Sequence, residues 1–327
     1  MKKTTYALDY EEWVELNGDR QNIRIRSCDA KNPVILFLHG GPGVCDRHWV
    51  MHYQSELAGR YTMVLWDQRG SGKSYRKTIK AGTPQVEDYI QDARALIEYL
   101  CRKFDQKKLI IACHSWGTVI GAPLAQRYPE RILAYIAQGQ VVNGAENERI
   151  SYEFCLEEAR KANDRKALQK LEGNGPVDGV YPSAKAMRAQ RDCLTRYGGA
   201  DYKERGGLIP SLLIPLLRME GYRLRDIPGY VQGALYLSDV MWPQVVARDY
   251  DVSIPALTMP VLMTTGRHDY NTPFQLARQW YARLDCPWKE WIWFEDSAHS
   301  PIKEEPKKWG LAVDAFLQKV IAADART

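Results

Sequence analysis

The chain has 327 residues, of which 45% are hydrophobic and 26% are charged, so it carries enough apolar side chains for a large buried core and too many for a disordered chain. Its 45 basic and 40 acidic residues leave a net charge of only +5 and are interspersed along the sequence, which argues against a nucleic-acid partner. No apolar run approaches the length of a membrane span, so we expect no membrane partner.

Strand-like and helix-like patterns alternate along most of the chain. Residues of alternating polarity flank the Asn17-Gly18 turn, which predicts a β-hairpin close to the start. Short continuous apolar runs, typical of strands buried on both faces of a parallel sheet, follow at 34–38, 63–66, 109–112, 132–136, 261–263 and 292–294. Apolar residues at helical spacing occur between them, at 86–104, 116–128, 272–284 and 304–321. This alternation predicts an α/β fold with a mostly parallel, doubly wound sheet.

The alternation stops between residues 143 and 256, where helical patterns and loops occur with few strand-like runs. Residues 153–171, rich in Glu, Arg, Lys and Ala, are typical of a single helix. We therefore expect residues 1–142 and 257–327 to form the core domain. Residues 143–256 are expected to form a helical cap domain, inserted after the predicted strand at 132–136.

The segment Cys113-His114-Ser115-Trp116-Gly117 follows a predicted strand and opens a predicted helix. That is the context of a nucleophile elbow, a tight turn that exposes its central serine at the end of a sheet, so we predict Ser115 as a nucleophile. The residues two before and two after the serine must be small; Gly117 meets this requirement, and Cys113 stands where glycine is usual. His114 is expected to pack or hydrogen-bond locally, because neighbouring side chains on such a turn point apart. The alternative is an ordinary turn, since a Ser-x-Gly triplet alone is common.

Glycines follow the predicted strand at 34–38, in the order His39-Gly40-Gly41-Pro42-Gly43. Glycines let the backbone approach a ligand closely, and an oxyanion needs fixed N–H donors. We expect one donor from Trp116, the residue after the nucleophile, and the other from Gly41, with Gly40 also beside the substrate. The alternative is a plain glycine turn; ligands of open α/β sheets bind at the carboxyl ends of the strands, which favours the oxyanion loop.

A serine hydroxyl needs a general base, and the base needs an orienting acid. Of the six histidines, His299 is our candidate base, because it follows the last strand-like run and precedes the final helix, at the same sheet edge as Ser115. Asp269, after the run at 261–263, is our candidate acid, and the order serine, aspartate, histidine is the one expected with a nucleophile elbow. The alternatives are a surface-loop histidine, and an aspartate that caps the following helix or pairs with Arg267.

Asp67 and Arg69 follow the run at 63–66. These charges either contact substrate or pair with each other and brace the turn, and we favour the pairing. The Gly-Ser-Gly-Lys-Ser portion that follows is similar to a phosphate loop but lacks that motif's first glycine, because Asp67 stands there, so it predicts no nucleotide site.

Seven cysteines are scattered along the chain with no Cys-x-x-Cys pair. This odd, unclustered set predicts neither a disulfide framework nor a zinc site, and we expect no metal and no organic cofactor. Free thiols fit a reducing compartment, and the first residues, Met1 to Tyr6, lack the apolar core of a signal peptide, so we expect a cytoplasmic protein. We expect it to act as a monomer or a small homo-oligomer.

Several motifs together resemble those of the proline iminopeptidase (prolyl aminopeptidase) group of serine hydrolases with the α/β-hydrolase fold. The matching segments are 39–43, 66–72, 115–117, 266–269 and the loop of His299. The resemblance covers roughly residues 30–142 and 258–320. It implies the α/β-hydrolase fold with an inserted helical cap.

The resemblance also implies the roles of the site residues. Ser115, Asp269 and His299 would form the catalytic triad, and the N–H groups of Gly41 and Trp116 would hold the oxyanion. The substrate would be a small peptide that loses its N-terminal residue.

The cap departs from this group, whose aminopeptidases hold the substrate amine with cap glutamates, one of them within a Glu-Asn-His-Tyr-Phe-like motif. Here Glu146-Asn147 shares the first two letters, but Glu148-Arg149 follows where aromatics are expected. Most of the available glutamates are better interpreted as solvated helix charges: Glu146, Glu148, Glu153, Glu157, Glu158 and Glu220. The cap aromatics predict a mostly apolar pocket: Tyr222, Tyr230, Tyr236 and Trp242.

The function we expect is hydrolysis of an amide or ester bond through an acyl-enzyme, first of all as a proline iminopeptidase-like aminopeptidase. One alternative is a carboxylesterase or lactonase acting on small acyl esters. Another is a non-catalytic small-molecule binding protein on the same fold, against which the complete set of serine, acid and base argues. A dehalogenase or epoxide hydrolase would need an aspartate where Ser115 stands.

Overall fold

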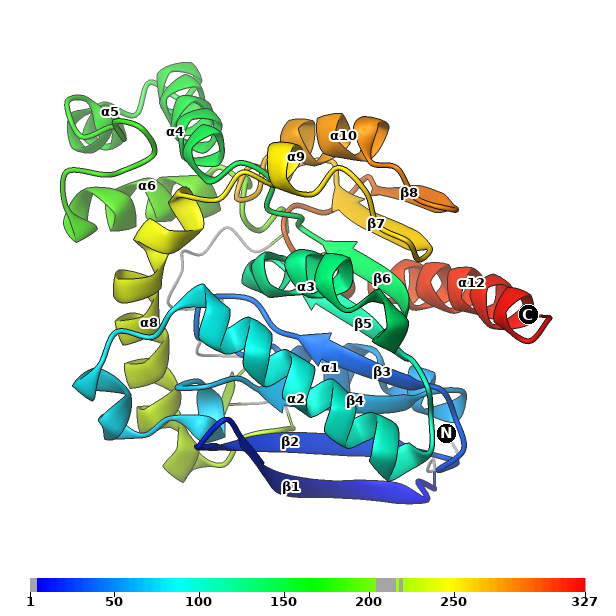
Figure 1. The fold of residues 1–327 in the computed structure, drawn as a ribbon. Helices are drawn as coiled ribbons and strands as arrows, with labels where there is room; N and C mark the ends of the chain where they lie inside the picture. Colours follow the sequence, from blue (N-terminus) through cyan, green and yellow to red (C-terminus); the bar gives the residue numbers. More distant parts are fainter. Residues whose placement is uncertain (1–4, 204–215, 218–219, 327) are drawn as a thin grey trace.

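The computed structural model describes residues 5–203, 216–217 and 220–326. Its described strands form one sheet of eight, in the order β1-β2-β4-β3-β5-β6-β7-β8 (Figure 1). Their bounds are β1 (Leu8–Leu16), β2 (Asp19–Ser27), β3 (Val34–Leu38), β4 (Thr62–Asp67), β5 (Leu109–His114), β6 (Ile132–Gln138), β7 (Val261–Gly266) and β8 (Lys289–Phe294). The predicted hairpin is β1 and β2, and β2 also pairs antiparallel with β4. All neighbours from β4 to β8 are parallel, which confirms the predicted mostly parallel sheet.

Helices cover both faces of this sheet (Figure 1). The flanking elements are α1 (Arg47–Tyr53), η1 (Ser55–Gly59), η2 (Gly72–Ser74), η3 (Lys77–Ala81), α2 (Val86–Phe104), α3 (Trp116–Arg127), η4 (Pro129–Arg131), α10 (Phe274–Arg283), α11 (Pro301–Glu304) and α12 (Pro306–Asp324). Alternate residues of β3 point to opposite faces: Val34, Leu36 and Leu38 join the core under α2 and α3, and Ile35 and Phe37 join the core under α1 and α12. Because each central strand contributes side chains to the cores on both faces of the sheet, its sequence is continuously apolar.

The predicted helical region lies between β6 and β7. It contains α4 (Gly144–Lys161), α5 (Arg165–Leu171), α6 (Ala184–Arg196), η5 (Leu224–Asp226), α8 (Ile227–Val246) and α9 (Tyr250–Ser253). The first three helices pack around a small core of their own that includes Cys155, Leu171 and Leu194. In contrast, α8 packs Leu237 and Val245 onto the main core. The inserted region therefore has one part with its own core and one part fastened to the sheet domain.

The prediction of one helix over 153–171 is wrong. The chain forms α4 and α5 instead, with Asn163 between them at φ 51°. Asp164 then caps α5 by accepting a hydrogen bond from the N–H of Ala167 at 3.0 Å. Asparagine tolerates the left-handed conformation and aspartate favours the N-cap position, so a break here follows from local chemistry that composition alone conceals.

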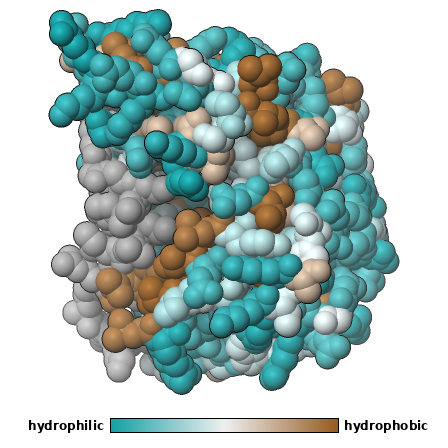
Figure 2. All heavy atoms as spheres, turned by 90° about the vertical axis from the view of Figure 1, so that its left-hand side faces the viewer, coloured by the Kyte–Doolittle hydropathy of each residue, from teal (hydrophilic) through white to brown (hydrophobic). Residues whose placement is uncertain are grey.

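Figure 2 views the molecule from the side of α8 and the cap helices and shows a band of apolar residues on an otherwise largely hydrophilic face. Leu235 of α8 and Leu224 of η5 are among the exposed apolar side chains of the described residues. None of the described helices is both long and apolar enough to cross a membrane.

Candidate active site

Ser115 lies at the turn between β5 and α3, where it is the N-cap residue of the helix. Its backbone has φ 52° and ψ −117°, a combination that residues with a side chain rarely adopt and that collects at functional sites. Its N–H donates to the carbonyl of Gln138 at 2.9 Å, and its carbonyl accepts from the N–H of Thr118 at 2.8 Å. These contacts hold a strand-turn-helix geometry that is typical of a nucleophile elbow.

Close packing explains the small residues around this turn. A Cβ atom on Gly117 would lie 2.0 Å from the carbonyl oxygen of Leu38, so no larger residue fits between α3 and β3. A Cβ atom on Gly121 would lie 2.3 Å from Sγ of Cys113. The thiol of Cys113 therefore occupies space that Gly121 leaves open, which is how the elbow accommodates cysteine at a position where glycine is usual.

Asp269 and His299 contact each other directly. Asp269 follows β7 and is 1% exposed, and its Oδ2 atom lies 3.0 Å from Nδ1 of His299 and 2.9 Å from Oγ1 of Thr272. Its Oδ1 atom accepts from the N–H groups of Asn271 at 3.0 Å and Thr272 at 2.9 Å. Because an ionised carboxylate only accepts hydrogen bonds, Nδ1 carries the ring proton and Nε2 keeps its lone pair.

Ser115 and His299 line one cavity of about 330 Å³. Gly40, Gly41 and Trp116 line it too, and Asp269 lies directly behind the histidine. The hydrogen bonds of the His299 ring go to Asp269 and Thr272 rather than to Ser115. The structure thus gathers the predicted site residues from separate loops at one edge of the sheet.

The loop after β3 passes close to Ser115. A Cβ atom on Gly40 would lie 3.5 Å from Cβ of Ser115, and the next residue, Gly41, has φ 121° and precedes a cis peptide bond to Pro42. Only glycine adopts that backbone region readily. The N–H of Trp116 lies in the first turn of α3, where amide groups lack an intrahelical acceptor. Backbone donors from two elements therefore border the cavity.

Two other histidines lie close to Ser115. His39 donates from Nδ1 to the carbonyl of Gly40 at 2.7 Å and accepts at Nε2 from the N–H of Gln68 at 3.2 Å. Burial lowers the pKa of His39, in keeping with a neutral ring that donates at one nitrogen and accepts at the other. His114 makes the local contact that we predicted, since its Nδ1 lies 3.2 Å from Oδ2 of Asp46. Burial acts to raise the pKa of Asp46, but the hydrogen bond and charge of His114 outweigh it and lower that pKa.

The predicted pairing of Asp67 with Arg69 is wrong. Nη2 of Arg47 lies 3.0 Å from Oδ1 of Asp67, and Nε of Arg69 lies 2.8 Å from Oδ2 of Asp92. The two side chains leave the turn on opposite sides of the sheet, Asp67 toward α1 and Arg69 toward α2. Each is therefore neutralised by a different helix.

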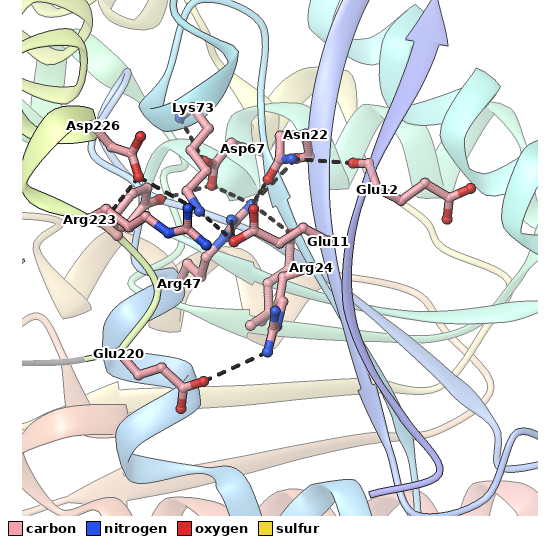
Figure 3. Close-up of polar contacts among 12 residues, drawn as sticks. Glu11, Glu12, Asn22, Arg24, Arg47, Asp67, Lys73, Glu220, Arg223 and Asp226 are labelled. Carbon is pink, nitrogen blue, oxygen red and sulfur yellow. Dashed lines mark hydrogen bonds and ion pairs between the residues drawn. The ribbon is translucent and has the colours of Figure 1, made fainter.

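Asp67 and Arg47 form the centre of a polar network (Figure 3). The network connects the sheet domain to residues 220–226 of the inserted region. Tyr222 donates to Oδ1 of Asp67 at 2.8 Å, and Lys73 lies 3.7 Å from Asp226. Glu220 pairs with the arginines of β2. The segment from 220 to 226 is thereby fastened to the β1–β2–β4 side of the sheet.

One cap glutamate differs from the others. Glu148 of α4 is fully buried and lines the cavity, and both its oxygens accept from Nη2 of Arg191 at 2.8 Å. The Arg191 guanidinium lies 5.1 Å from the ring centroid of Trp242 on α8. The prediction of solvated helix charges is confirmed for Glu153, whose side chain is 56% exposed, and is wrong for Glu148. Glu220 is 55% exposed but lies in a turn and pairs with Arg26 at 2.6 Å.

The cap aromatics divide between the cavity and the core. Trp242 lines the cavity, as the prediction of an aromatic pocket requires. Tyr230 is instead buried and Tyr222 partly buried in a small cluster with Cys45, where the Tyr230 hydroxyl donates to the carbonyl of Cys45 at 2.8 Å. The Tyr236 hydroxyl donates to the backbone of η3 at 3.4 Å. Only part of the predicted set therefore faces a ligand.

The chain that leaves α6 crosses between the acid and base loops. The carbonyl of Gly199 accepts from the N–H of Tyr270 at 2.9 Å, and the carbonyl of Ala200 accepts from the N–H of His299 at 3.2 Å. Tyr270 is the residue after the candidate acid, so this one crossing segment contacts both loops.

Glu304 connects the loop of His299 to the segment that leaves α6. We did not predict this residue as part of the site. Its Oε2 accepts from the N–H of Ala298 at 2.8 Å and its Oε1 from the N–H of Tyr202 at 2.7 Å. Burial, followed by the charge of Asp201, raises the pKa of Glu304 to about 7. Perturbed acids of this kind gather at functional sites.

The described cysteines are all free thiols. Burial raises the pKa of the Cys45 and Cys113 thiols well above the usual range, so these neighbours of the cavity stay protonated at neutral pH. Within the part of the chain that the structure describes, no group of three or more His, Cys, Asp or Glu side chains is placed to hold a metal ion.

Known proteins share this architecture. Residues 33–173 match the family described as alpha/beta hydrolase fold. The chain is 32% identical over 297 residues to the probable aminopeptidase YbaC of Bacillus subtilis (strain 168), which covers 90% of this chain and 91% of that protein. It is 24% identical over 320 residues to the proline iminopeptidase of Heyndrickxia coagulans, over 95% of this chain and 99% of that protein. The crystal structure of the Mycobacterium smegmatis proline iminopeptidase matches with a TM-score of 0.65 at 15% identity, over 96% of this chain and 100% of that chain, which shows a common fold.

The sheet order, the elbow at Ser115 and the match to YbaC along most of both chains lead to one conclusion. The chain belongs to the α/β-hydrolase fold family.

Proposed function

We propose that this protein is a serine hydrolase that cleaves an amide or ester bond through an acyl-enzyme, with Ser115 as nucleophile, His299 as general base and Asp269 as the orienting acid. The observation that carries the proposal is the 3.0 Å contact between Nδ1 of His299 and Oδ2 of Asp269 at the cavity that Ser115 lines. This contact aims the basic nitrogen, Nε2, away from the acid. The strained backbone of Ser115 supports the same role.

In the proposed reaction, Nε2 of His299 takes the hydroxyl proton as Oγ of Ser115 attacks the substrate carbonyl carbon. The carbonyl oxygen becomes an oxyanion, held by the N–H groups of Gly41 and Trp116. The imidazolium gives its proton to the leaving amine or alcohol, which departs and leaves the acyl-enzyme. Water that loses a proton to Nε2 then releases the acid and restores Ser115. Substrate binding must bring Oγ and Nε2 into contact, because the ring's present hydrogen bonds go elsewhere.

The proposed substrate is a small peptide with a free N-terminal amine, cleaved after its first residue. The names of the similar proteins, a probable aminopeptidase in Bacillus subtilis and a proline iminopeptidase in Heyndrickxia coagulans, support this choice. In this proposal, residues 1–142 and 257–327 form the core domain that carries the chemistry. Residues 143–256 form the cap domain that supplies the substrate contacts.

An N-terminal amine calls for a carboxylate in the cavity. Glu148 and Asp201 line it, but each already pairs with a cation, Arg191 for the former and Lys303 for the latter. Asp239 of α8 also lines it and its side chain is 53% exposed. Among the described residues its one ion-pair contact is with Arg188, at 3.9 Å. Asp239 is therefore our candidate for the amine contact.

The test compares alanyl, leucyl and prolyl 4-nitroanilides with their N-acetylated forms, using the wild type, Ser115→Ala and Asp239→Asn. We expect turnover of the free-amine substrates, loss of turnover in Ser115→Ala, and a KM for Asp239→Asn that rises roughly tenfold, the equivalent of ~1.4 kcal/mol. Asp192→Asn, which changes an exposed carboxylate of α6 outside the cavity lining, is the matched control. Activity that survives Ser115→Ala would overturn the mechanism, and equal turnover of N-acetylated substrates would overturn the aminopeptidase.

A carboxylesterase or lactonase is the second candidate. The observation that favours it is the pairing of Glu148 with Arg191 and of Asp201 with Lys303, which leaves much of the charged cavity wall neutral and suits an uncharged acyl ester. In that case 4-nitrophenyl butyrate is cleaved with a KM that Asp239→Asn leaves unchanged. A non-catalytic binding protein, in contrast, would leave Ser115 unlabelled by a fluorophosphonate probe.

A further inference from the structure

We propose that Gln68 is a positioning residue that holds the two oxyanion donors in register by bridging the oxyanion loop and the indole of Trp116. This inference rests on the proposed function, because it assigns a task to a residue that acts through Gly41 and Trp116 and touches no substrate itself.

Gln68 uses both ends of its side-chain amide. Its Oε1 accepts from Nε1 of Trp116 at 2.8 Å, and its Nε2 donates to the carbonyl of His39 at 3.3 Å. One side chain therefore joins the residue after the nucleophile to the residue that opens the oxyanion loop. Its own backbone N–H adds a third contact, to Nε2 of His39 at 3.2 Å.

The His39 ring carries this restraint to the donor itself. Nδ1 of His39 donates to the carbonyl oxygen of Gly40 at 2.7 Å. That carbonyl and the N–H of Gly41 belong to the same planar peptide group, so fixing the direction of one fixes the direction of the other. Gly41 has φ 121° and carries no side chain, so no side-chain contact of its own restrains this peptide group. The contacts of His39, and through them Gln68, set where the Gly41 N–H points.

Burial makes these contacts strong and hard to replace. Gln68 is fully buried, and Trp116 and His39 are each 2% exposed. Water has no access to compete for their polar groups, so a hydrogen bond that is lost here leaves a buried donor or acceptor without a partner. A rigid, dry setting of this kind is what oxyanion donors require, because they must be aimed before the charge develops.

The competing interpretation is that Gln68 only stabilises the core. The chain contains a matched pair for comparison: Gln21 is also fully buried, and its Oε1 accepts from Nε1 of Trp66 at 2.8 Å. Neither Gln21 nor Trp66 lines the cavity. Gln21→Met thus removes the same kind of buried amide–indole contact without touching the oxyanion loop.

The experiment uses the full-length protein and the variants Gln68→Met, Trp116→Phe, their combination, and Gln21→Met. Methionine keeps the length of the side chain and the backbone contact of residue 68. Phenylalanine removes the indole donor of residue 116 together with part of its ring and keeps an aromatic side chain there. We measure kcat and KM on the best substrate, the inhibition constant of phenylboronic acid, and the thermal midpoint. Phenylboronic acid adds to the nucleophile and presents a tetrahedral oxygen to the oxyanion donors.

We expect Gln68→Met to lower kcat roughly 10- to 100-fold, with KM changed less than about twofold, since the lost interaction acts on the transition state. The inhibition constant of phenylboronic acid should rise by a similar factor. In protein that already carries Gln68→Met, Trp116→Phe should lower kcat little further, because both changes break the same hydrogen bond between residues 68 and 116. Gln21→Met should lower the thermal midpoint and leave kcat unchanged.

Two results would overturn the proposal: full kcat and boronate affinity in Gln68→Met, or additive losses in the double variant. If Gln68→Met fails to fold, Trp116→Phe alone decides, since an unchanged kcat there also rejects the bridge. Failure of the proposed function looks different, because wild-type protein would then neither bind phenylboronic acid nor lose activity in Ser115→Ala.

Discussion

Asp269 and His299 meet through Oδ2 and Nδ1 at 3.0 Å, with both side chains almost completely buried. The other oxygen of the carboxylate accepts from two backbone N–H groups, which fix the side chain; in the proposed mechanism it would stay in place while the ring takes and returns a proton. Asp269 and His299 lie near the same cavity as Ser115, although they follow it by 154 and 184 positions, which is too far for any local sequence pattern to relate them.

Replacement of Asp269 tests whether its contact with His299 places the ring proton on Nδ1. In Asp269→Asn the amide can donate to Nδ1, which moves the ring proton to Nε2 and removes the base. We expect kcat to fall about 10⁴-fold, whereas Ser115→Ala should lose about 10⁶-fold. Steady-state kinetics on one substrate gives both numbers, and circular dichroism melting curves check that each variant is folded. An Asp269→Asn enzyme within tenfold of wild type would contradict the role of the acid.

The raised pKa of Glu304 predicts a specific pH dependence of stability. Its folded-state pKa, about 7, lies above the ordinary 4.5, so the folded protein binds this proton more tightly than the unfolded chain does. The stabilisation is therefore complete below about pH 4.5 and is lost as pH rises through about 7. Urea titrations of the wild type and Glu304→Gln should show their difference in unfolding free energy changing within that window only. A difference that stays constant with pH would show that the pKa is not raised.

Gly117→Ala tests the close approach of α3 to β3. Because the added Cβ would meet the carbonyl oxygen of Leu38 at 2.0 Å, backbone must move, and we expect a loss of about 3 kcal/mol or more in unfolding free energy. Gly59→Ala is the control, since nothing lies within 4 Å of its Cβ position, and it should change stability by no more than about 1 kcal/mol. Equal effects of the two changes in a urea titration would reject the packing argument.

Asp67→Asn tests the buried ion pair beneath the oxyanion loop. The change leaves the 1% exposed Arg47 side chain without its closest carboxylate, so unfolding free energy should fall by about 3–5 kcal/mol. Glu98→Gln removes an exposed partner of Arg94 on α2 and should cost less than about 1 kcal/mol. Guanidinium denaturation curves distinguish the two; a loss of similar size in both would mean that Asp67 contributes no more than a surface charge.

Local sequence patterns were sufficient to predict the elements whose structure depends mainly on residues close together in the chain. The run at 34–38 coincides with β3 and the helical spacing at 86–104 with α2, because alternation and amphipathicity are read directly from adjacent residues. The candidate site was predicted in the same way, because Ser115 follows one predicted strand and the loops of Asp269 and His299 follow two others. Parallel strands bring such loops to one edge whatever the details of packing.

The ion-pair partners of individual charged side chains could not be predicted from such local patterns. The sequence places Asp67 two positions from Arg69, but the helices on either side supply Arg47 and Asp92, and only the three-dimensional packing decides between them. The burial of Glu148 was not predicted, because glutamate usually marks a solvated face. A closer signal was present, since Cys155, at helical spacing from Glu148, lies on the same buried side of α4.

The segment that leaves α6 hydrogen-bonds through Gly199 to the residue after the acid and through Ala200 to the base itself. Any swing of the inserted helices that opened a route for substrate would pull on both attachment points at once. In the proposed mechanism, substrate entry by that route and alignment of the His299 imidazole would therefore be coupled, because one displaced segment would move the loops of Asp269 and His299 together.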